Sequence, residues 1–258
     1  MKLTFAGVGG AFTDQRYYQS NMVLTSGSGE RLLIDCGGDA RFSLGELGCT
    51  NQNVGDWVDG VYISHLHADH IGGLEWLGFC TFFNPKAKRP TLFIVESLVD
   101  DLWDSLKGGM RSHEGMVLRL DSFFDVKVIP VNQPFYWGNV SFQPIQTVHI
   151  MDGYRIVPSY GLIMHELKKD NTGVFLTTDT QFCPRQIEKF YDRAGVIFQD
   201  CETYNFKSGV HAHYDDLKTL PEETKAKMWL YHYGTDPQQD PVADGFLGFV
   251  KKGQTFEF

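Results

Sequence analysis

The chain has 258 residues, of which 42% are hydrophobic and 14% are aromatic, so it can bury a substantial core in one large domain. Its formal net charge of -9 argues against a broad basic surface for nucleic-acid backbone, so long nucleic acid is an unfavoured partner. A small anionic substrate remains compatible with this charge, because bound metal ions supply positive charge locally.

Short runs of β-branched and aromatic residues, bounded by glycine or polar turns, predict strands at residues 2–7, 21–26, 31–37, 60–65, 91–96, 126–131, 140–149, 160–166, 173–179, 195–201 and 228–233. Helices are predicted between some of these strands, at residues 73–83, 98–106, 184–191 and 221–227. No linker rich in proline, glycine or serine divides the chain, and no internal repeat is present. The sequence therefore predicts a single layered α/β domain over residues 1–258.

Other features of the chain indicate where the protein works. The five cysteines are widely spaced and form no CxxC pair, which favours buried thiols in a reducing cytosol over a disulfide framework. The first residues read as a strand and a glycine turn rather than a signal peptide, and no apolar run is long enough to predict a membrane span. We therefore predict a cytoplasmic protein without a membrane partner.

Reactive side chains recur where a predicted strand ends. They are His65, His149, Asp179, Glu202 and His232. Strand ends on one edge of a sheet can aim side chains from distant parts of the sequence at a common point. That is the arrangement a metal site needs.

The segment YISHLHADHIGG places His65, His67, Asp69 and His70 within six positions. A loop that leaves a strand and enters a helix can bring these side chains together, and the two glycines that follow them permit such a turn. The alternative is a solvated loop. Clustered histidine and aspartate are costly to bury unless a ligand compensates the desolvation, so the cluster favours a metal site.

The pattern HxHxDH followed by GG resembles the metallo-β-lactamase fold superfamily. The resemblance continues along the chain, with His149 in IQTVH, Asp179 in FLTTDT and His232 in WLYHY keeping the family's order and approximate spacing. It implies an α/β protein with a four-layer αββα sandwich.

The same resemblance implies a centre with two metal ions, usually zinc. Its expected ligands are His65, His67 and His149 for one ion and Asp69, His70 and His232 for the other, with Asp179 between them. Nitrogen and oxygen donors suit two Zn²⁺ per subunit, and they also suit manganese or iron. A bridging aspartate, where true β-lactamases of this fold commonly have cysteine, favours the branches that cleave phosphodiesters, thioesters or lactones.

The stretch DCETYNFKSGVHAHYDDL is the predicted source of a proton donor. Resemblance to the phosphodiesterase branch implies an acidic residue after a strand and then a histidine that protonates the leaving oxygen. Glu202 and His211 match this pattern best, because Asp215 follows His211 by four residues, and His213 is the competing histidine. Asp69 is expected to orient the attacking water while it binds metal. The alternative is a solvated histidine pair at the start of a helix.

Two longer stretches, ISHLHADHIGGLEWLGF and SGVHAHYDDLKTLPEETKAKMWLYHY, look like the small phosphodiesterases of this fold that include phage anti-Pycsar nucleases and their bacterial relatives. This resemblance implies hydrolysis of 3′,5′-cyclic mononucleotides to linear nucleotides, with cCMP and cUMP as substrates and cAMP and cGMP as further candidates. It also implies a homodimer in which a loop of one subunit helps close the other's pocket. The biological result would be evasion of Pycsar antiphage signalling for a viral gene and nucleotide housekeeping for a bacterial one, and the sequence leaves both open.

Three alternatives remain. A tRNA 3′-processing endonuclease would need a glycine- and proline-rich basic arm, and no such arm is predicted between residues 121 and 171. A thioesterase or lactonase would not need His211. A scaffold that only retains nucleotides would not need the complete set of ligands.

The glycines at positions 7, 9 and 10 read as a tight turn beside the site rather than a nucleotide-binding loop.

Overall fold

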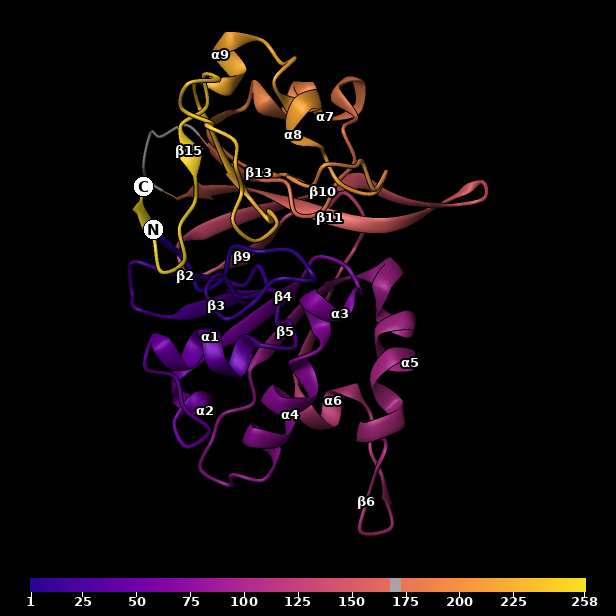
Figure 1. Cartoon of the computed structure of the whole chain (residues 1–258). Coiled ribbons are helices and arrows are strands. Elements are labelled where there is room, and N and C mark those ends of the chain that lie inside the picture. Colours follow the sequence, from indigo (N-terminus) through magenta and orange to yellow (C-terminus); the bar gives the residue numbers. More distant parts are fainter. Residues whose placement is uncertain (168–172) are drawn as a thin grey trace.

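The computed structural model describes residues 1–167 and 173–258, in which two seven-stranded sheets face each other (Figure 1). The first sheet has the order β16-β1-β2-β3-β4-β5-β8, with β1 (Lys2–Phe5), β2 (Met22–Thr25), β3 (Arg31–Ile34), β4 (Gly60–Ile63), β5 (Thr91–Val95), β8 (Asp125–Ile129) and β16 (Thr255–Glu257). The second has the order β15-β14-β13-β12-β11-β10-β9, with β9 (Phe135–Trp137), β10 (Val140–Asp152), β11 (Arg155–Glu166), β12 (Gly173–Leu176), β13 (Ala194–Asp200), β14 (Met228–Tyr231) and β15 (Gly248–Phe249).

Helices cover the outer face of each sheet (Figure 1). On the side of the first sheet lie α1 (Ala40–Glu46), α2 (Val54–Trp57), α3 (Ala68–Ile71), α4 (Leu74–Phe82), α5 (Val99–Met110) and α6 (Leu120–Phe123). On the side of the second lie α7 (Pro184–Tyr191), α8 (Tyr214–Leu217) and α9 (Glu222–Lys225). A small hairpin of β6 (Ser112–His113) and β7 (Met116–Val117) follows α5. The predicted four-layer αββα sandwich is confirmed.

The second sheet is apolar on both faces. In β11, Leu162 and Met164 belong to the core shared with the first sheet, whereas Ile163 belongs to the core beneath α7 and α8. In β12, Leu176 belongs to the shared core and Phe175 to the core beneath α7 and α8. Successive side chains of a strand point to opposite faces, so a strand covered on both sides reads as a continuous apolar run. The inner faces of the two sheets therefore share one hydrophobic core.

The direction of the parallel strands in each sheet determines where the candidate site residues lie. β3, β4 and β5 are parallel neighbours in the first sheet, and β12, β13 and β14 are parallel neighbours in the second. The carboxyl ends of parallel neighbours lie at the same edge of a sheet, so the residues that follow β4, β12, β13 and β14 come together. The predicted ligands His65, Asp179 and His232 are among them.

The hairpin of β10 and β11 projects beyond the sandwich (Figure 1). Its end exposes Met151, Tyr154, Ile156 and Val157. No long arm was predicted between residues 121 and 171. That prediction missed the projecting hairpin, because β10 and β11 continue beyond their last buried residues. The projecting end is apolar, with Arg155 as its basic residue, and so differs from the basic arm that was considered.

The five cysteines are free thiols. None of the helices in the described part of the chain is long and apolar enough to cross a membrane.

Candidate metal centre

The loop between β4 and α4 brings four of the predicted ligands together. His65 follows β4, His67 is the N-cap of α3 with φ -70° and ψ 153°, and the single turn of α3 carries Asp69 and His70. Gly37 packs so closely against this turn that a Cβ on it would lie 2.1 Å from the Asp69 carbonyl oxygen. Close contact between two backbone segments therefore helps hold the turn that carries Asp69 and His70.

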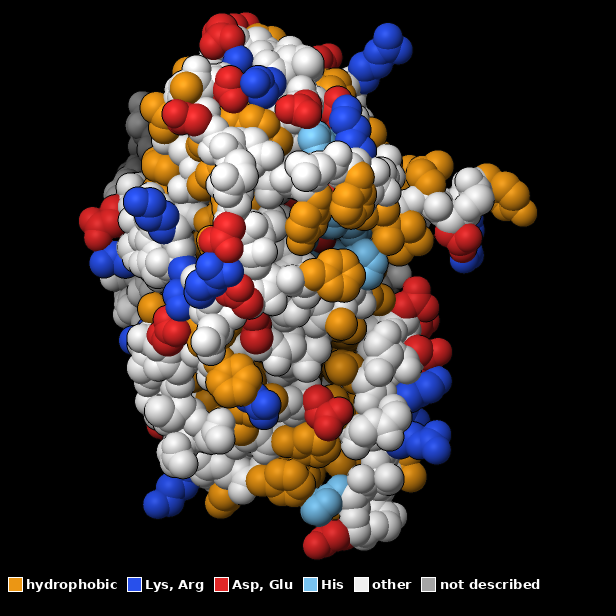
Figure 2. Space-filling view, in the orientation of Figure 1, with side chains coloured by type: hydrophobic (Ala, Val, Ile, Leu, Met, Phe, Trp, Pro, Cys, Tyr) orange, Lys and Arg blue, Asp and Glu red, His pale blue; other side chains and the backbone are white. Residues whose placement is uncertain are grey.

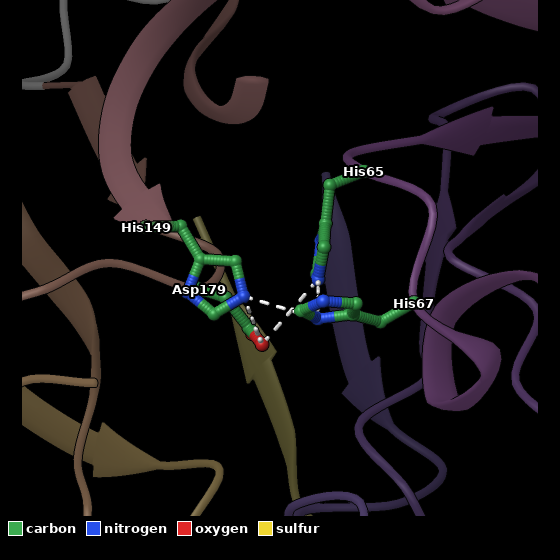
Figure 3. A group of neighbouring side chains, drawn as sticks. All are labelled: His65, His67, His149 and Asp179. Atoms are coloured by element: carbon green, nitrogen blue, oxygen red, sulfur yellow. Dashed lines mark hydrogen bonds and ion pairs between the residues drawn. The ribbon is translucent and has the colours of Figure 1, made fainter. Parts of the chain in front are cut away.

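Three imidazoles and one carboxylate converge in the first group of candidate ligands: His65, His67, His149 and Asp179 (Figure 3). Nε2 of His65 and Nε2 of His149 each lie 3.1 Å from Nδ1 of His67. Oδ2 of Asp179 lies 3.5 Å from His65 Nε2 and 3.7 Å from His149 Nε2. Tetrahedral ligands about 2.0 Å from zinc lie roughly 3.3 Å from one another, so these separations fit one zinc ion.

The second group contains Asp69, His70, Asp179 and His232. Oδ2 of Asp69 lies 3.3 Å from Nε2 of both His70 and His232. Asp179 presents Oδ2 to His70 Nε2 at 3.3 Å and Oδ1 to His232 Nε2 at 3.4 Å. Asp179 thus belongs to both groups, and its carboxylate can hold two cations side by side.

Irregular backbone aims the ligands of the second sheet. The pairing of β10 with β11 shifts by one residue at His149, and such a bulge redirects a side chain. Thr178, which precedes Asp179, and His232 both adopt positive φ, 51° and 64°. Strained backbone at functional sites is held by the surrounding structure. Gly10 lies against the His232 ring, where a Cβ would approach Cε1 to 3.4 Å, so the predicted glycine turn does lie beside the site.

Hydrogen bonding within the centre fits bound cations. Among the described residues, His70 Nε2 and Asp179 Oδ1 are buried without a hydrogen-bond partner, which is unusual for polar atoms. The opposite ring nitrogens are occupied: His70 Nδ1 donates to Asp35 Oδ2 at 2.8 Å, and His149 Nδ1 donates to the Val210 carbonyl at 2.7 Å. Such bonds fix the tautomer and direct Nε2 toward a metal. The residues present therefore fit two divalent cations.

The candidate ligands differ in how the centre shifts their pKa values. Burial, aided by nearby His70, lowers the pKa of His65 well below its usual value, so this imidazole is neutral and can donate its lone pair. Burial alone would raise the pKa of Asp179. The surrounding imidazoles of His232 and His70 outweigh that effect and hold its pKa well below the usual range. Burial opposes protonation of His70 and His232, but the Asp179 carboxylate outweighs it and raises the pKa of both imidazoles. Neutral imidazole and ionised carboxylate are the forms that bind metal, so cations that bind here displace the protons of His70 and His232.

His211, the predicted proton donor, lies beside the centre and is paired with Asp200. Its Nδ1 donates to Asp200 Oδ2 at 2.9 Å and lies 3.9 Å from Asp179 Oδ2. Burial opposes protonation of His211, but the Asp200 carboxylate outweighs it and raises the pKa of His211 above its usual value. The acidic partner of His211 is thus Asp200 rather than Glu202, the residue expected from sequence.

Glu202 and His213 bind backbone instead. Glu202 Oε2 accepts a hydrogen bond from the Ser208 amide at 2.9 Å. His213 is the N-cap of α8: its Nδ1 accepts from the Asp215 amide at 3.2 Å, and its Nε2 donates to the Tyr204 carbonyl at 2.8 Å. These bonds shape the loop that carries His211.

Asp35 and Asp200 are the functional candidates that the sequence analysis missed. Each carboxylate stands where a predicted strand ends, in RLLIDCG and in GVIFQDC, which is the same signal that identified the other site residues. Spacing cannot show which of two nearby acids faces a histidine, so Glu202 was preferred to its neighbour two positions earlier.

A cavity of about 320 Å³ opens next to the centre. Its lining comes from the turn after β1 and the loop after β13, together with His211 and His232. Aromatic rings form much of its wall.

Comparison with solved structures identifies the class of fold. The structure matches the metallo-β-lactamase fold protein YhfI from Bacillus subtilis with a TM-score of 0.72 over 99% of both chains at 21% identity. It matches a diphosphatase of the PhnP family with a TM-score of 0.71 at 19% identity, over 100% of this chain and 97% of the other. The short form of human tRNase Z gives 0.67 at 16% identity, over 100% and 99%. The chain therefore has the metallo-β-lactamase fold.

Sequence comparison identifies the family. The family model described as "Anti-Pycsar protein Apyc1" matches residues 1–256. Proteins of that name from Bacillus phage vB_BveM-Goe7 and from Paenibacillus harenae are each 32% identical to this chain, covering 98% and 100% of it and 96% and 100% of their own length. The chain belongs to the anti-Pycsar protein Apyc1 family, as its motifs suggested.

Proposed function

We propose that this protein is a metal-dependent phosphodiesterase that hydrolyses 3′,5′-cyclic mononucleotides, cCMP and cUMP among them, to linear nucleotides. The observation that carries the proposal is the shared carboxylate of Asp179, which joins two donor groups beside the His211–Asp200 pair. A cavity of suitable size for a mononucleotide adjoins them. Family membership supports the anti-Pycsar role, since relatives of that name come from both phages and bacteria.

Two Zn²⁺ ions are the proposed cofactors, and Mn²⁺ suits the same donors. Their proposed ligands are His65, His67, Asp69, His70, His149, Asp179 and His232. When bound, two such ions supply an activated water and neutralise the charge that develops on a phosphate.

The chain's own residues supply positioning and a proton. In the proposed reaction, oxygen from water bonds to phosphorus, one ester bond of the ring breaks, and His211 gives its proton to the ribose oxygen that leaves. Asp200 holds the ring of His211 through Nδ1, so Nε2 is the nitrogen that serves the substrate. Asp69 orients the attacking water. His213 is the weaker candidate for the acid, because both of its ring nitrogens are engaged with backbone groups.

We also propose that the protein acts as a homodimer in the cytoplasm of a bacterial cell, where cyclic nucleotide signals and phage proteins meet. This part of the proposal rests on family membership. A net charge of -9 disfavours long nucleic acid as the substrate.

Incubation of purified protein with distinct substrate classes tests the proposal. The panel contains cCMP, cUMP, cAMP and cGMP, a precursor tRNA, a thioester and a lactone, each with and without chelator. We expect linear nucleotides from the cyclic substrates and no product after chelation. Cleavage of precursor tRNA alone would favour the endonuclease alternative, and turnover of the thioester or lactone alone would favour the third class. No linear nucleotide from any cyclic substrate would refute the proposal.

A further inference from the structure

We infer that Phe12, Tyr204 and Phe206 form an aromatic wall that binds the nucleobase of the substrate by stacking. The inference rests on the proposed function, because it requires a nucleotide substrate. It assigns to these three side chains a role in substrate recognition, separate from the metal centre and the proton donor.

The three rings line the same cavity as the candidate catalytic group. Phe12 comes from the turn after β1, and Tyr204 and Phe206 come from the loop after β13, while His211 and His232 line the cavity on the side of the metal centre. A substrate whose phosphate meets His211 therefore has its remaining part within reach of the rings. A volume of about 320 Å³ is in the range of small-ligand sites.

The rings of Phe12 and Phe206 are exposed, so a ligand in the cavity can contact them. Phe12 is 90% exposed and Phe206 is 65% exposed. Figure 2 shows hydrophobic side chains gathered around histidines near the middle of this face. Aromatic side chains gain favourable energy when a flat apolar surface covers them, and a base offers such a surface.

The chain holds Tyr204 and its loop in place before any substrate arrives. The Tyr204 ring packs on Gly234, where a Cβ would lie 2.8 Å from Cε1, and stacks on Phe206 with ring centres 5.7 Å apart and planes 10° apart. His213 fixes the Tyr204 carbonyl, and Glu202 fixes the amide of Ser208 in the same loop. Glu202 and His213, expected from sequence to act in catalysis, thus support the wall. A preorganised surface loses less entropy on binding.

Charge on the lining favours the base over the phosphate at this wall. None of the described residues that line the cavity is a lysine or arginine. Lys207, which lies in the loop between two lining residues, forms an ion pair with Asp216. An anionic group would therefore find little attraction among the rings, whereas the apolar face of a base would.

Two substrates, one with a base and one without, distinguish the effect of base stacking from the effect on the hydrolytic step. One is cUMP, and the other is methyl riboside 3′,5′-cyclic phosphate, which has a methoxy group in place of the base. For Phe12→Leu and Phe206→Leu, we expect the ratio of kcat/KM for cUMP to that for the methyl riboside to fall roughly tenfold, mainly through KM. Phe206→Tyr should restore the ratio. Phe83→Leu is the matched control, because Phe83 is an exposed phenylalanine at the end of α4.

A binding measurement gives a readout without turnover. The base protons of a slowly hydrolysed cUMP phosphorothioate should shift upfield in NMR spectra on addition of wild-type protein, and less with Phe206→Leu. An unchanged substrate ratio in both leucine variants, or no upfield shift with the wild type, would overturn the inference. Hydrolysis of both compounds with an unchanged ratio would leave the proposed function intact. Upfield shifts without hydrolysis of either compound would support the wall and refute the proposed function.

Discussion

His211 differs from the ligand histidines in what its ring nitrogens meet. Nδ1 is bonded to Asp200, and Nε2 makes no hydrogen bond with any residue in the described part of the chain. The side chain is 20% exposed and lines the cavity, whereas the candidate ligand His149 is 1% exposed. This geometry suits transfer of a proton to a substrate.

Replacement of His211 tests its role as the acid. For His211→Ala we expect kcat with cUMP to fall by about 10²–10⁴-fold, the usual contribution of a positioned general acid, while metal content stays at the wild-type level. Steady-state kinetics and elemental analysis measure the two quantities. His113→Asn, in the distant β6–β7 hairpin, serves as the control. A nearly silent His211→Ala variant would contradict the assignment.

Asp35 contacts the metal centre through the candidate ligand His70. It accepts a hydrogen bond from His70 Nδ1, and Ser64 donates to it with both its amide and its hydroxyl. Its φ of 62° is in the left-handed region, which asparagine also tolerates. Asparagine can therefore replace it with little change to the backbone.

For Asp35→Asn we expect zinc affinity to fall about 10–100-fold, because His70 loses the Asp35 carboxylate that orients its ring. Competition with a chromogenic chelator measures the affinity. Asp59→Asn, which also alters a carboxylate bonded to a backbone amide but at the start of β4, should bind zinc like the wild type. Equal affinities in all three proteins would show that Asp35 does not support the centre.

Some elements could be predicted from sequence and others could not. Strands such as β4 and β12 are buried along their whole length, so their apolar runs identify them. The single turns α3 and α8 have too few residues to show a helical period, and tertiary contacts form them. His65, Asp179 and His232 could be identified because each ends or follows a recognisable strand. The pairing of His211 with Asp200 depended on side-chain direction, which sequence does not reveal.

The contact between the turn after β3 and α3 is the local interaction that positions the first ligands. Gly37→Ala places a methyl group against the Asp69 carbonyl, so we expect a loss of stability of about 1–3 kcal/mol together with weaker metal binding. Urea denaturation and metal titration measure these changes. Gly108→Ala is the matched substitution, because Gly108 lies in α5 and an added Cβ there would meet open space. This variant should keep the wild-type stability or gain about 0.5–1 kcal/mol. Equal stabilities would contradict this view of the turn.

Across the whole molecule, the centre joins the two sheets. His65, His67, Asp69 and His70 follow the first sheet, and His149, Asp179 and His232 come from the second. A cation held by both sets binds the folded chain and not the unfolded one, so it stabilises the sandwich.

Removal of metal should therefore lower the melting temperature. At metal concentrations about a thousandfold above Kd, we expect chelation to reduce Tm by on the order of 10 °C in calorimetry. His149→Ala, which removes a ligand from the second sheet, should melt at a low temperature with or without chelator. A wild-type Tm that is insensitive to chelator would argue against a metal bridge between the sheets.

Hydrolysis of cUMP by metal-free and zinc-reconstituted protein, followed by ³¹P NMR, tests the central claim most directly. Our account predicts conversion of the cyclic phosphate to a linear monophosphate by the reconstituted protein, and none by the metal-free protein or by Asp179→Ala. Conversion at equal rates with and without metal, or no conversion by fully reconstituted protein, would contradict it.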